Sequence, residues 1–171
     1  MYVAMEGNRN KSKPRALLVF GAPCSGKTTF AEKFAEKFGL TYYDLTTFES
    51  EYGFGPDDLF AVLELILRTR QSIVIEGCID SEKDRTELRN FLRCHGYDPA
   101  LIWVQTDINT IRLRLKMRHK SVSKAKKVYE DAVVLLEAPT DIEKPIILSG
   151  KHTFDTQVKH VVKGFAELTE K

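Results

Sequence analysis

Apolar and polar positions follow two alternating patterns along the chain. Short apolar runs predict buried strands at 16–20, 40–44, 72–76, 100–104 and 145–148. Apolar residues spaced three or four apart predict helices at 27–38, 57–69, 81–94, 107–118, 124–136 and 155–168. Strands that alternate with helices in this way indicate an α/β fold with a parallel sheet.

Signals at the helix ends support these boundaries. Gly39 ends the first predicted helix, Pro56 stands at the start of the second, and Ser81 can cap the third. No helix or strand is predicted between Asp44 and Pro56.

The composition is that of one globular domain. The chain has 171 residues, and 26 Lys and Arg against 24 Asp and Glu give a net charge of +2. This balance provides no strong overall attraction to nucleic acid or to a membrane surface. No apolar run is long enough to cross a bilayer. We expect a single domain over residues 15–171, preceded by a flexible lead at 1–14.

The three cysteines have no metal-ligand spacing. An odd number of cysteines without such spacing suggests reduced thiols in a reducing compartment. We therefore expect a cytoplasmic protein, and we leave its oligomeric state open.

Residues 21–28 match the phosphate-binding pattern G-x-x-x-x-G-K-[ST] in full, between a predicted strand and a predicted helix. Backbone N–H groups of such a loop surround phosphate oxygens, and the helix N-terminus adds positive charge. Lys27 would neutralise the β- and γ-phosphates, and the Thr28 hydroxyl would bind Mg²⁺. The predicted nucleotide contacts are Gly21, Ala22, Pro23, Cys24, Ser25, Gly26, Lys27, Thr28 and Thr29. ATP and Mg²⁺ are the expected cofactors, since no guanine-specific Asn-Lys-x-Asp motif is present.

This loop also sharpens the fold prediction. We expect a P-loop NTPase domain: a three-layer sandwich whose five-stranded parallel sheet has the order 2-3-1-4-5, with helices on both faces. In such a sheet the ligand lies beyond the carboxyl ends of the strands.

Acidic residues end two of the predicted strands. Glu76 is expected to hold a water on Mg²⁺, although a solvated glutamate would show the same pattern. Asp44 could accept the proton of an attacking hydroxyl, or it could simply cap a turn. Thr46, Thr47 and Glu49 lie close by in sequence and could share that role.

Three arginines on one predicted helix are candidates for stabilising the transferred phosphate. Arg114 and Arg118 are four residues apart and therefore share a face, whereas Arg112 lies nearer the apolar stripe. The alternative is a solvated basic face. The basic segment at 118–127 could form a mobile lid. Ser149 and Gly150 follow the last strand, where an adenine ring could sit, but a plain turn is equally compatible.

The chain resembles the small P-loop kinases of the zeta-toxin, polynucleotide-kinase and AAA_33-type group, within the adenylate-kinase-like lineage. The resemblance rests on the loop at 21–29, Asp44, the arginine helix at 110–118 and the segment 145–150. It implies phosphoryl transfer from ATP to a hydroxyl of a small molecule, a nucleotide or a nucleic-acid end. Asp44 would then act as the base, and Arg114 and Arg118 would hold the phosphates.

The sequence departs from that group at three points. Cys24 stands where members often have Gly, the third strand ends in Glu76 rather than Asp, and no Arg follows Asp44. The missing arginine leaves the acceptor open, because that residue commonly holds the substrate. A nucleotide-binding module or degenerate kinase without transfer activity is the alternative. Nucleic acid is a weaker candidate acceptor, since few aromatic residues accompany the basic ones at 112–127.

Overall fold

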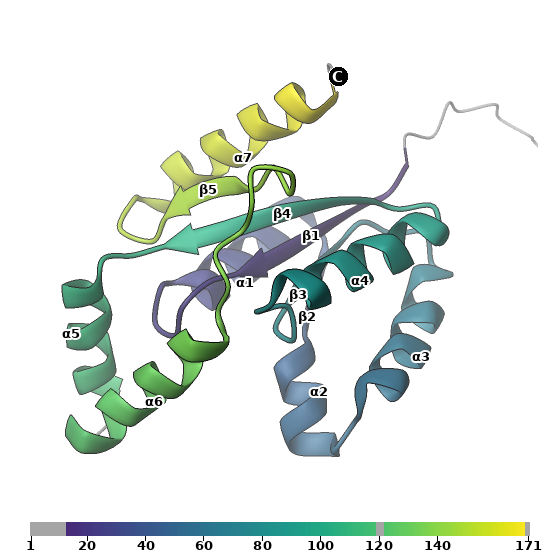
Figure 1. The fold of residues 1–171 in the computed structure, drawn as a ribbon. Coiled ribbons are helices and arrows are strands. Elements are labelled where there is room, and N and C mark those ends of the chain that lie inside the picture. Colours follow the sequence, from purple (N-terminus) through teal and green to yellow (C-terminus); the bar gives the residue numbers. More distant parts are fainter. Residues whose placement is uncertain (1–12, 119–121, 170–171) are drawn as a thin grey trace, which may run out of the picture.

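The computed structural model describes residues 13–118 and 122–169, and it contains a five-stranded parallel sheet enclosed by helices (Figure 1). The strands are β1 (Arg15–Phe20), β2 (Thr41–Asp44), β3 (Ile73–Glu76), β4 (Asp98–Gln105) and β5 (Ile146–Ser149). Their order in the sheet is β2-β3-β1-β4-β5, which confirms the predicted topology.

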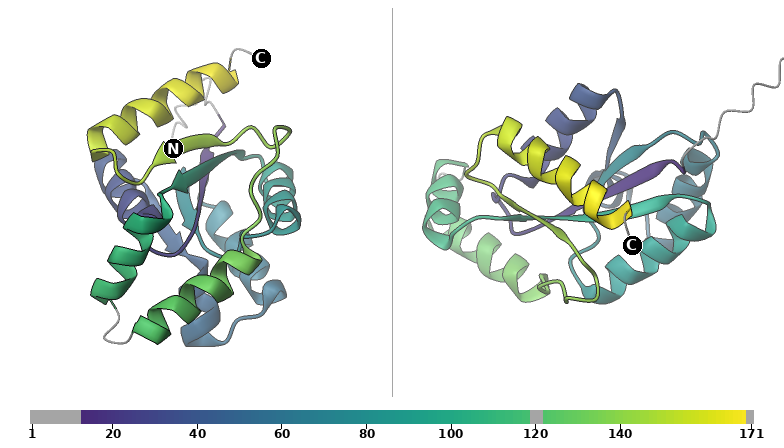
Figure 2. Two further views of the ribbon diagram at one scale, coloured as in Figure 1. Left: turned by 60° about the vertical axis from the view of Figure 1, so that its left-hand side comes forward. Right: turned by 90° about the horizontal axis from the view of Figure 1, so that it is seen from above.

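Seven helices lie in the described part of the chain. They are α1 (Lys27–Phe38), α2 (Leu45–Tyr52), α3 (Pro56–Leu67), α4 (Glu82–Cys94), α5 (Ile108–Arg118), α6 (Val122–Leu135) and α7 (Phe154–Thr169). Helices α1 and α7 cover one face of the sheet, and α3 and α4 cover the other (Figures 1 and 2). The predicted three-layer arrangement is therefore confirmed.

The central strand β1 shows why the core has two halves. Leu17 and Val19 pack on the side of α1 and α7, whereas Leu18 and Phe20 pack on the side of α3 and α4. Successive side chains of a strand point to opposite faces, so a strand buried on both faces is apolar throughout.

Two local features differ from the sequence prediction. Helix α2 lies in the segment between Asp44 and Pro56, where no helix was predicted; its N-terminus is capped by the Asp44 side chain, and Gly53 is its C-cap. Strand β4 begins before the predicted residue 100 and includes Pro99. The Asp98 N–H donates to Pro14 beside β1, so the nitrogen of Pro99 points the other way. On that side β4 pairs with β5, but only from Ile102 onward. The missing N–H of Pro99 therefore costs no hydrogen bond between strands.

Helices α5 and α6 stand beyond the carboxyl ends of the strands, apart from the two covering layers (Figure 1). In the predicted lid, Arg118 ends α5 and Val122 begins α6, while residues 119–121 lie outside the described residues. Residues 1–12 of the predicted N-terminal lead also lie outside them. No helix within the described ranges is long and apolar enough to span a membrane.

Candidate functional site

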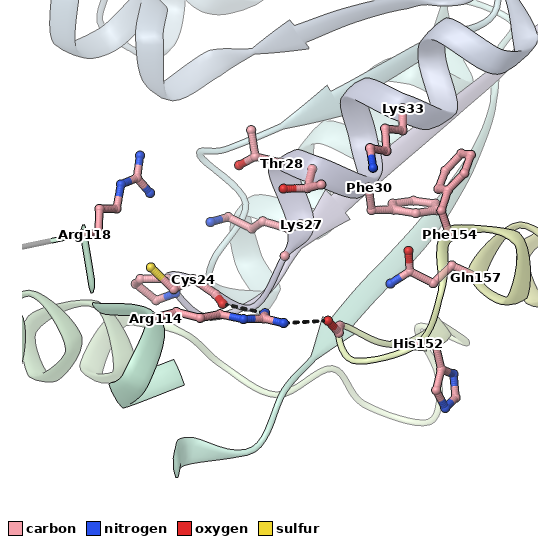
Figure 3. A pocket seen from close by; sticks show the side chains of 14 residues that line it. Cys24, Lys27, Thr28, Phe30, Lys33, Arg114, Arg118, His152, Phe154 and Gln157 are labelled. Carbon is pink, nitrogen blue, oxygen red and sulfur yellow. Dashed lines mark hydrogen bonds between the residues drawn. The ribbon is translucent and has the colours of Figure 1, made fainter. Parts of the chain in front are cut away.

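The loop between β1 and α1 surrounds an open cavity of about 600 Å³ (Figure 3). Gly26 and Cys24 have positive φ angles of 105° and 59°, which turn the backbone around this space. For Cys24 the left-handed conformation is strained, because its Cβ crowds the following carbonyl. Glycine has no Cβ and would adopt this conformation without that strain.

Arg114 of α5 is hydrogen-bonded to the backbone of the loop. Its Nη1 donates to the carbonyl oxygens of Cys24 at 3.0 Å and Ser25 at 3.1 Å, and its Nη2 donates to the carbonyl of Gly150 at 3.0 Å (Figure 3). The Thr106 hydroxyl also donates to Ser25 O, at 2.8 Å. These bonds tie the loop to α5, to the end of β4 and to the loop after β5.

Gly150 allows these segments to approach closely. A Cβ on Gly150 would collide with Ser25 O and with the Thr106 hydroxyl. The Gly150 N–H donates to Gln105 O at 2.7 Å, and Gln157 Nε2 donates to the carbonyl of Ser149 at 2.9 Å. The segment at 149–150 therefore lies directly against the phosphate-binding loop, and Gly150 and Gln157 line its cavity.

The first turn of α1 meets the end of β3 at Glu76. The Thr28 hydroxyl donates to Glu76 Oε1 at 2.7 Å, Lys27 Nζ lies 3.6 Å from the same oxygen, and the Tyr42 hydroxyl donates to Oε2 at 3.0 Å. Glu76 is only 4% exposed. Burial, followed by the negative charge of Glu76, raises the pKa of Tyr42 above its usual value, so this hydroxyl stays a donor. The sequence did not single out Tyr42.

The oxygens of Thr28 and Glu76 suit a Mg²⁺ ion bound together with ATP. Mg²⁺ prefers oxygen ligands and commonly takes few from the protein, the rest being waters and phosphate oxygens. No group of three or more His, Cys, Asp or Glu residues in the described ranges could hold a metal by itself. A role for Thr28 and Glu76 at a nucleotide-bound Mg²⁺ stays a prediction.

Asp44 lies beside Glu76 in the β2–β3 pairing and begins α2. Its Oδ1 accepts from the Thr46 N–H at 2.9 Å, and its Oδ2 accepts from the Thr47 hydroxyl at 3.1 Å. Gly77 permits this approach, because a Cβ there would collide with Thr46 and lie 3.2 Å from Asp44 Oδ1. Asp44 is thus both a helix cap and a carboxylate next to the predicted Mg²⁺ donors.

Asp80 is a second carboxylate in this region that sequence reasoning missed. It is half-buried after β3, and no hydrogen bond to its carboxylate is present within the described ranges. Burial raises the pKa of Asp80, and the nearby charge of Lys27 opposes this shift. Asp80 also lines a second cavity, of about 340 Å³, between α2, α3 and α4. Only its position between Lys27 and this cavity marks it as a candidate.

The three candidate arginines have different positions. Arg114 and Arg118 both line the nucleotide cavity, where Figure 3 shows them on separate sides. Arg118 is exposed and forms no hydrogen bond or ion pair with other described residues. Arg112 is exposed and does not line the cavity. A phosphate-binding role for Arg114 and Arg118 stays a prediction.

A buried ion pair supports the Asp80 loop from behind. Arg85, which is fully buried, donates to both carboxylate oxygens of Glu143 at 2.8 and 3.0 Å. It also donates to the carbonyls of Asp80 and Glu137. Burial is the largest influence and opposes ionisation of Glu143, but the hydrogen bonds from Arg85 and the Thr140 N–H, together with the charge of Arg85, outweigh it and lower the pKa of Glu143.

No protein-family model matches this sequence, and no curated protein sequence matches it. Solved structures do match its fold. A gluconokinase from Sinorhizobium meliloti 1021 has a TM-score of 0.67 and 18% identity, over 94% of this chain and 96% of that one. A sugar kinase from Janibacter sp. HTCC2649 has a TM-score of 0.69 and 19% identity, over 90% and 95%.

The Mycobacterium tuberculosis APS kinase CysC, solved in complex with AMPPNP and APS, has a TM-score of 0.62 and 14% identity, over 91% of this chain and 99% of that one. These neighbours are P-loop kinases, and their structures extend over nearly all of this chain. At such low identities the similarity concerns the fold, and membership of the zeta-toxin or AAA_33-type group stays a prediction. The chain therefore has the fold of the P-loop kinases.

Proposed function

We propose that this protein is an ATP-dependent kinase that transfers the γ-phosphate of Mg·ATP to a hydroxyl of a small molecule. One observation carries the proposal: Lys27 and Thr28, which line a nucleotide-sized cavity, meet at Glu76, and the charge of Lys27 also acts on Asp80, which lines a second cavity. A protein that only binds nucleotide needs no second cavity for an acceptor.

The nucleotide phosphates lie in the loop at 21–29, with backbone N–H groups and Lys27 around them. Mg²⁺ bound with them would take the Thr28 hydroxyl as a ligand, with Glu76 orienting a bound water, and would neutralise phosphate charge. Adenine occupies the side of the cavity that Arg114 and Gly150 border. Of the predicted residues Ser149 and Gly150, only Gly150 lines this cavity and would border the base.

The acceptor hydroxyl enters from the second cavity. Its oxygen bonds to the γ-phosphorus while the bridging bond to the β-phosphate breaks, and ADP leaves. Asp44 or Asp80 receives the hydroxyl proton; Asp44 follows from the family resemblance, and Asp80 from its unpaired carboxylate near Lys27. Lys27 and Arg118 stabilise the charge on the phosphoryl group during transfer, so positioning and electrostatics account for most of the catalysis.

The test is ADP release, measured by a coupled assay over a panel of hydroxyl-bearing metabolites, nucleosides and oligonucleotides. We expect at least one acceptor to stimulate ADP release, and Lys27→Ala to abolish the stimulation. Lys37→Ala is the matched control, because Lys37 is an exposed lysine of the same helix α1 and does not line this cavity. Turnover that survives Lys27→Ala would contradict the proposal.

A nucleotide-binding module without transfer activity is the second candidate. The hydrogen bonds of both Asp44 oxygens at the start of α2 favour it, because both oxygens already accept from groups of the protein. Thermal stabilisation by Mg·ATP, with no phosphorylated product from any acceptor, would support this candidate. A phosphorylated product would exclude it.

A further inference from the structure

The second cavity shows which chemical class of acceptor the site can take; this inference rests on the proposed function. The cavity measures about 340 Å³, within the range of sites for small organic molecules. Buried leucines from three helices line it: Leu45 of α2, Leu59 and Leu63 of α3, and Leu88 of α4. An apolar lining of this kind stabilises a ligand that buries a hydrocarbon part.

The charged side chains around the cavity are all acidic. They are Glu49 of α2, Asp80 of the loop after β3, and Asp84 and Glu87 of α4; no Lys or Arg of the described ranges lines it. Cys78, on the cavity wall, responds to this charge: burial first, then Glu49, with a smaller contribution from Asp80, raises its pKa to about 12. Acids from separate elements therefore act on the same space.

Structural roles account for only part of this acidic set. Asp84 accepts from the Ser81 hydroxyl at the start of α4, and the Cys78 thiol lies 3.7 Å from Glu49. Asp80 and Glu87 form no side-chain hydrogen bond or ion pair with other described residues. No three acids of the described ranges converge closely enough to hold a metal ion. The negative charge is thus spread around the cavity, as suits an organic cation larger than a metal ion.

We propose that the acceptor is an amino alcohol with a hydrocarbon part. Its hydrocarbon part packs on the leucines, its protonated amine lies near Glu49 and Glu87, and its hydroxyl points toward Asp80 and Lys27. A carboxylate or phosphate in place of the amine is rejected, because like charges repel strongly at the edge of an apolar cavity.

The test compares three compounds that share a phenyl-hydroxyethyl skeleton and differ in charge. They are 2-amino-1-phenylethanol, 1-phenylethane-1,2-diol and mandelate, titrated at pH 7 into the full chain with Mg·ADP present, by calorimetry or ligand-observed NMR. We expect the amine to bind about tenfold more tightly than the diol. Mandelate should bind more weakly than either, and the preference for the amine should decrease with added salt.

Glu49→Gln and Glu87→Gln should each reduce the preference for the amine about threefold, the effect of removing one partly screened charge. Glu51→Gln is the matched control: Glu51 is an exposed acid on the same helix as Glu49 but does not line the cavity, so the preference should stay unchanged. The proposal is overturned if mandelate or the diol binds as tightly as the amine. It is equally overturned if none of the three binds, or if the preference survives when Glu49→Gln and Glu87→Gln are combined in one protein.

Failure of this inference can be separated from failure of the kinase proposal. Binding of the amine without any ADP release would overturn the kinase proposal and leave the acceptor class standing. ADP release stimulated by anionic acceptors alone would support the kinase proposal and overturn the acceptor class.

Discussion

Arg114 offers the sharpest test of how this site works. All three of its hydrogen bonds go to backbone carbonyls, two in the phosphate-binding loop and one at Gly150. If that is its role with nucleotide bound, then Arg114 shapes the loop and the base side of the cavity instead of holding the γ-phosphate. Arg114→Lys separates the two roles, because lysine keeps the charge but lacks the fork that reaches three carbonyls.

The magnitude follows from these contacts. A hydrogen bond from a charged donor contributes about 1.5–3 kcal/mol. Because the three bonds share one partly exposed guanidinium, we take about 1.5–3 kcal/mol for the whole group rather than for each bond. Without these hydrogen bonds, the loop conformation that binds nucleotide becomes a minor one. The observed affinity then falls in proportion to the fraction of molecules in that conformation. The expected loss is about 10- to 150-fold.

The assay is calorimetric titration of Mg·ADP and of a non-hydrolysable Mg·ATP analogue into Arg114→Lys, Arg114→Met and the parent protein. We expect both variants to lose affinity for the two nucleotides by the same factor. Arg112→Met is the control, since Arg112 is exposed on the same helix and does not line the cavity. A selective loss of ATP analogue affinity in Arg114→Met, with near-normal affinity in Arg114→Lys, would show that Arg114 acts on the γ-phosphate and refute this reasoning.

Three further predictions concern stability. Cys24→Gly should raise the free energy of unfolding by about 0.5–1 kcal/mol in urea titrations, because relief of the left-handed strain at φ 59° exceeds the added entropy of the unfolded chain. A lower free energy of unfolding would contradict the strain at Cys24. Glu143→Gln should cost about 3–5 kcal/mol at pH 7, because Arg85 would stay buried without its anion. In the parent, the stabilisation from Glu143 is present above its ordinary pKa of 4.5 and is lost as the pH falls through the lowered folded pKa, which urea titrations against pH can follow. Asp80→Asn should raise the Tm at pH 7, because burial raises the pKa of Asp80 and so disfavours its ionised form in the folded protein. The gain in Tm should disappear as the pH falls below 3.8, where the carboxyl is protonated in both states; a gain that does not depend on pH would contradict this cause.

The fold was largely predictable from local patterns. Strands β1 and β3 are buried on both faces and therefore appear as continuous apolar runs, and Ser81 caps α4 as expected from its sequence position. Helix α2 was missed because it has only eight residues, and its short apolar stripe of Leu45, Phe48 and Tyr52 is a weak signal. Its two end signals, Asp44 and Gly53, were visible in the sequence, but each is also common in turns.

For the site, the sequence by itself determined the phosphate-binding loop, because its glycine spacing and the Lys27–Thr28 pair are encoded within eight consecutive residues. Only the tertiary structure decided the use of the remaining charges. It directs Arg114 to backbone carbonyls 90 and 36 residues away, brings Tyr42 to Glu76, and leaves Asp80 unpaired beside a second cavity. The physical reason is that burial and the available partners fix the role of a charged side chain, and both depend on segments that the sheet brings together from distant parts of the chain.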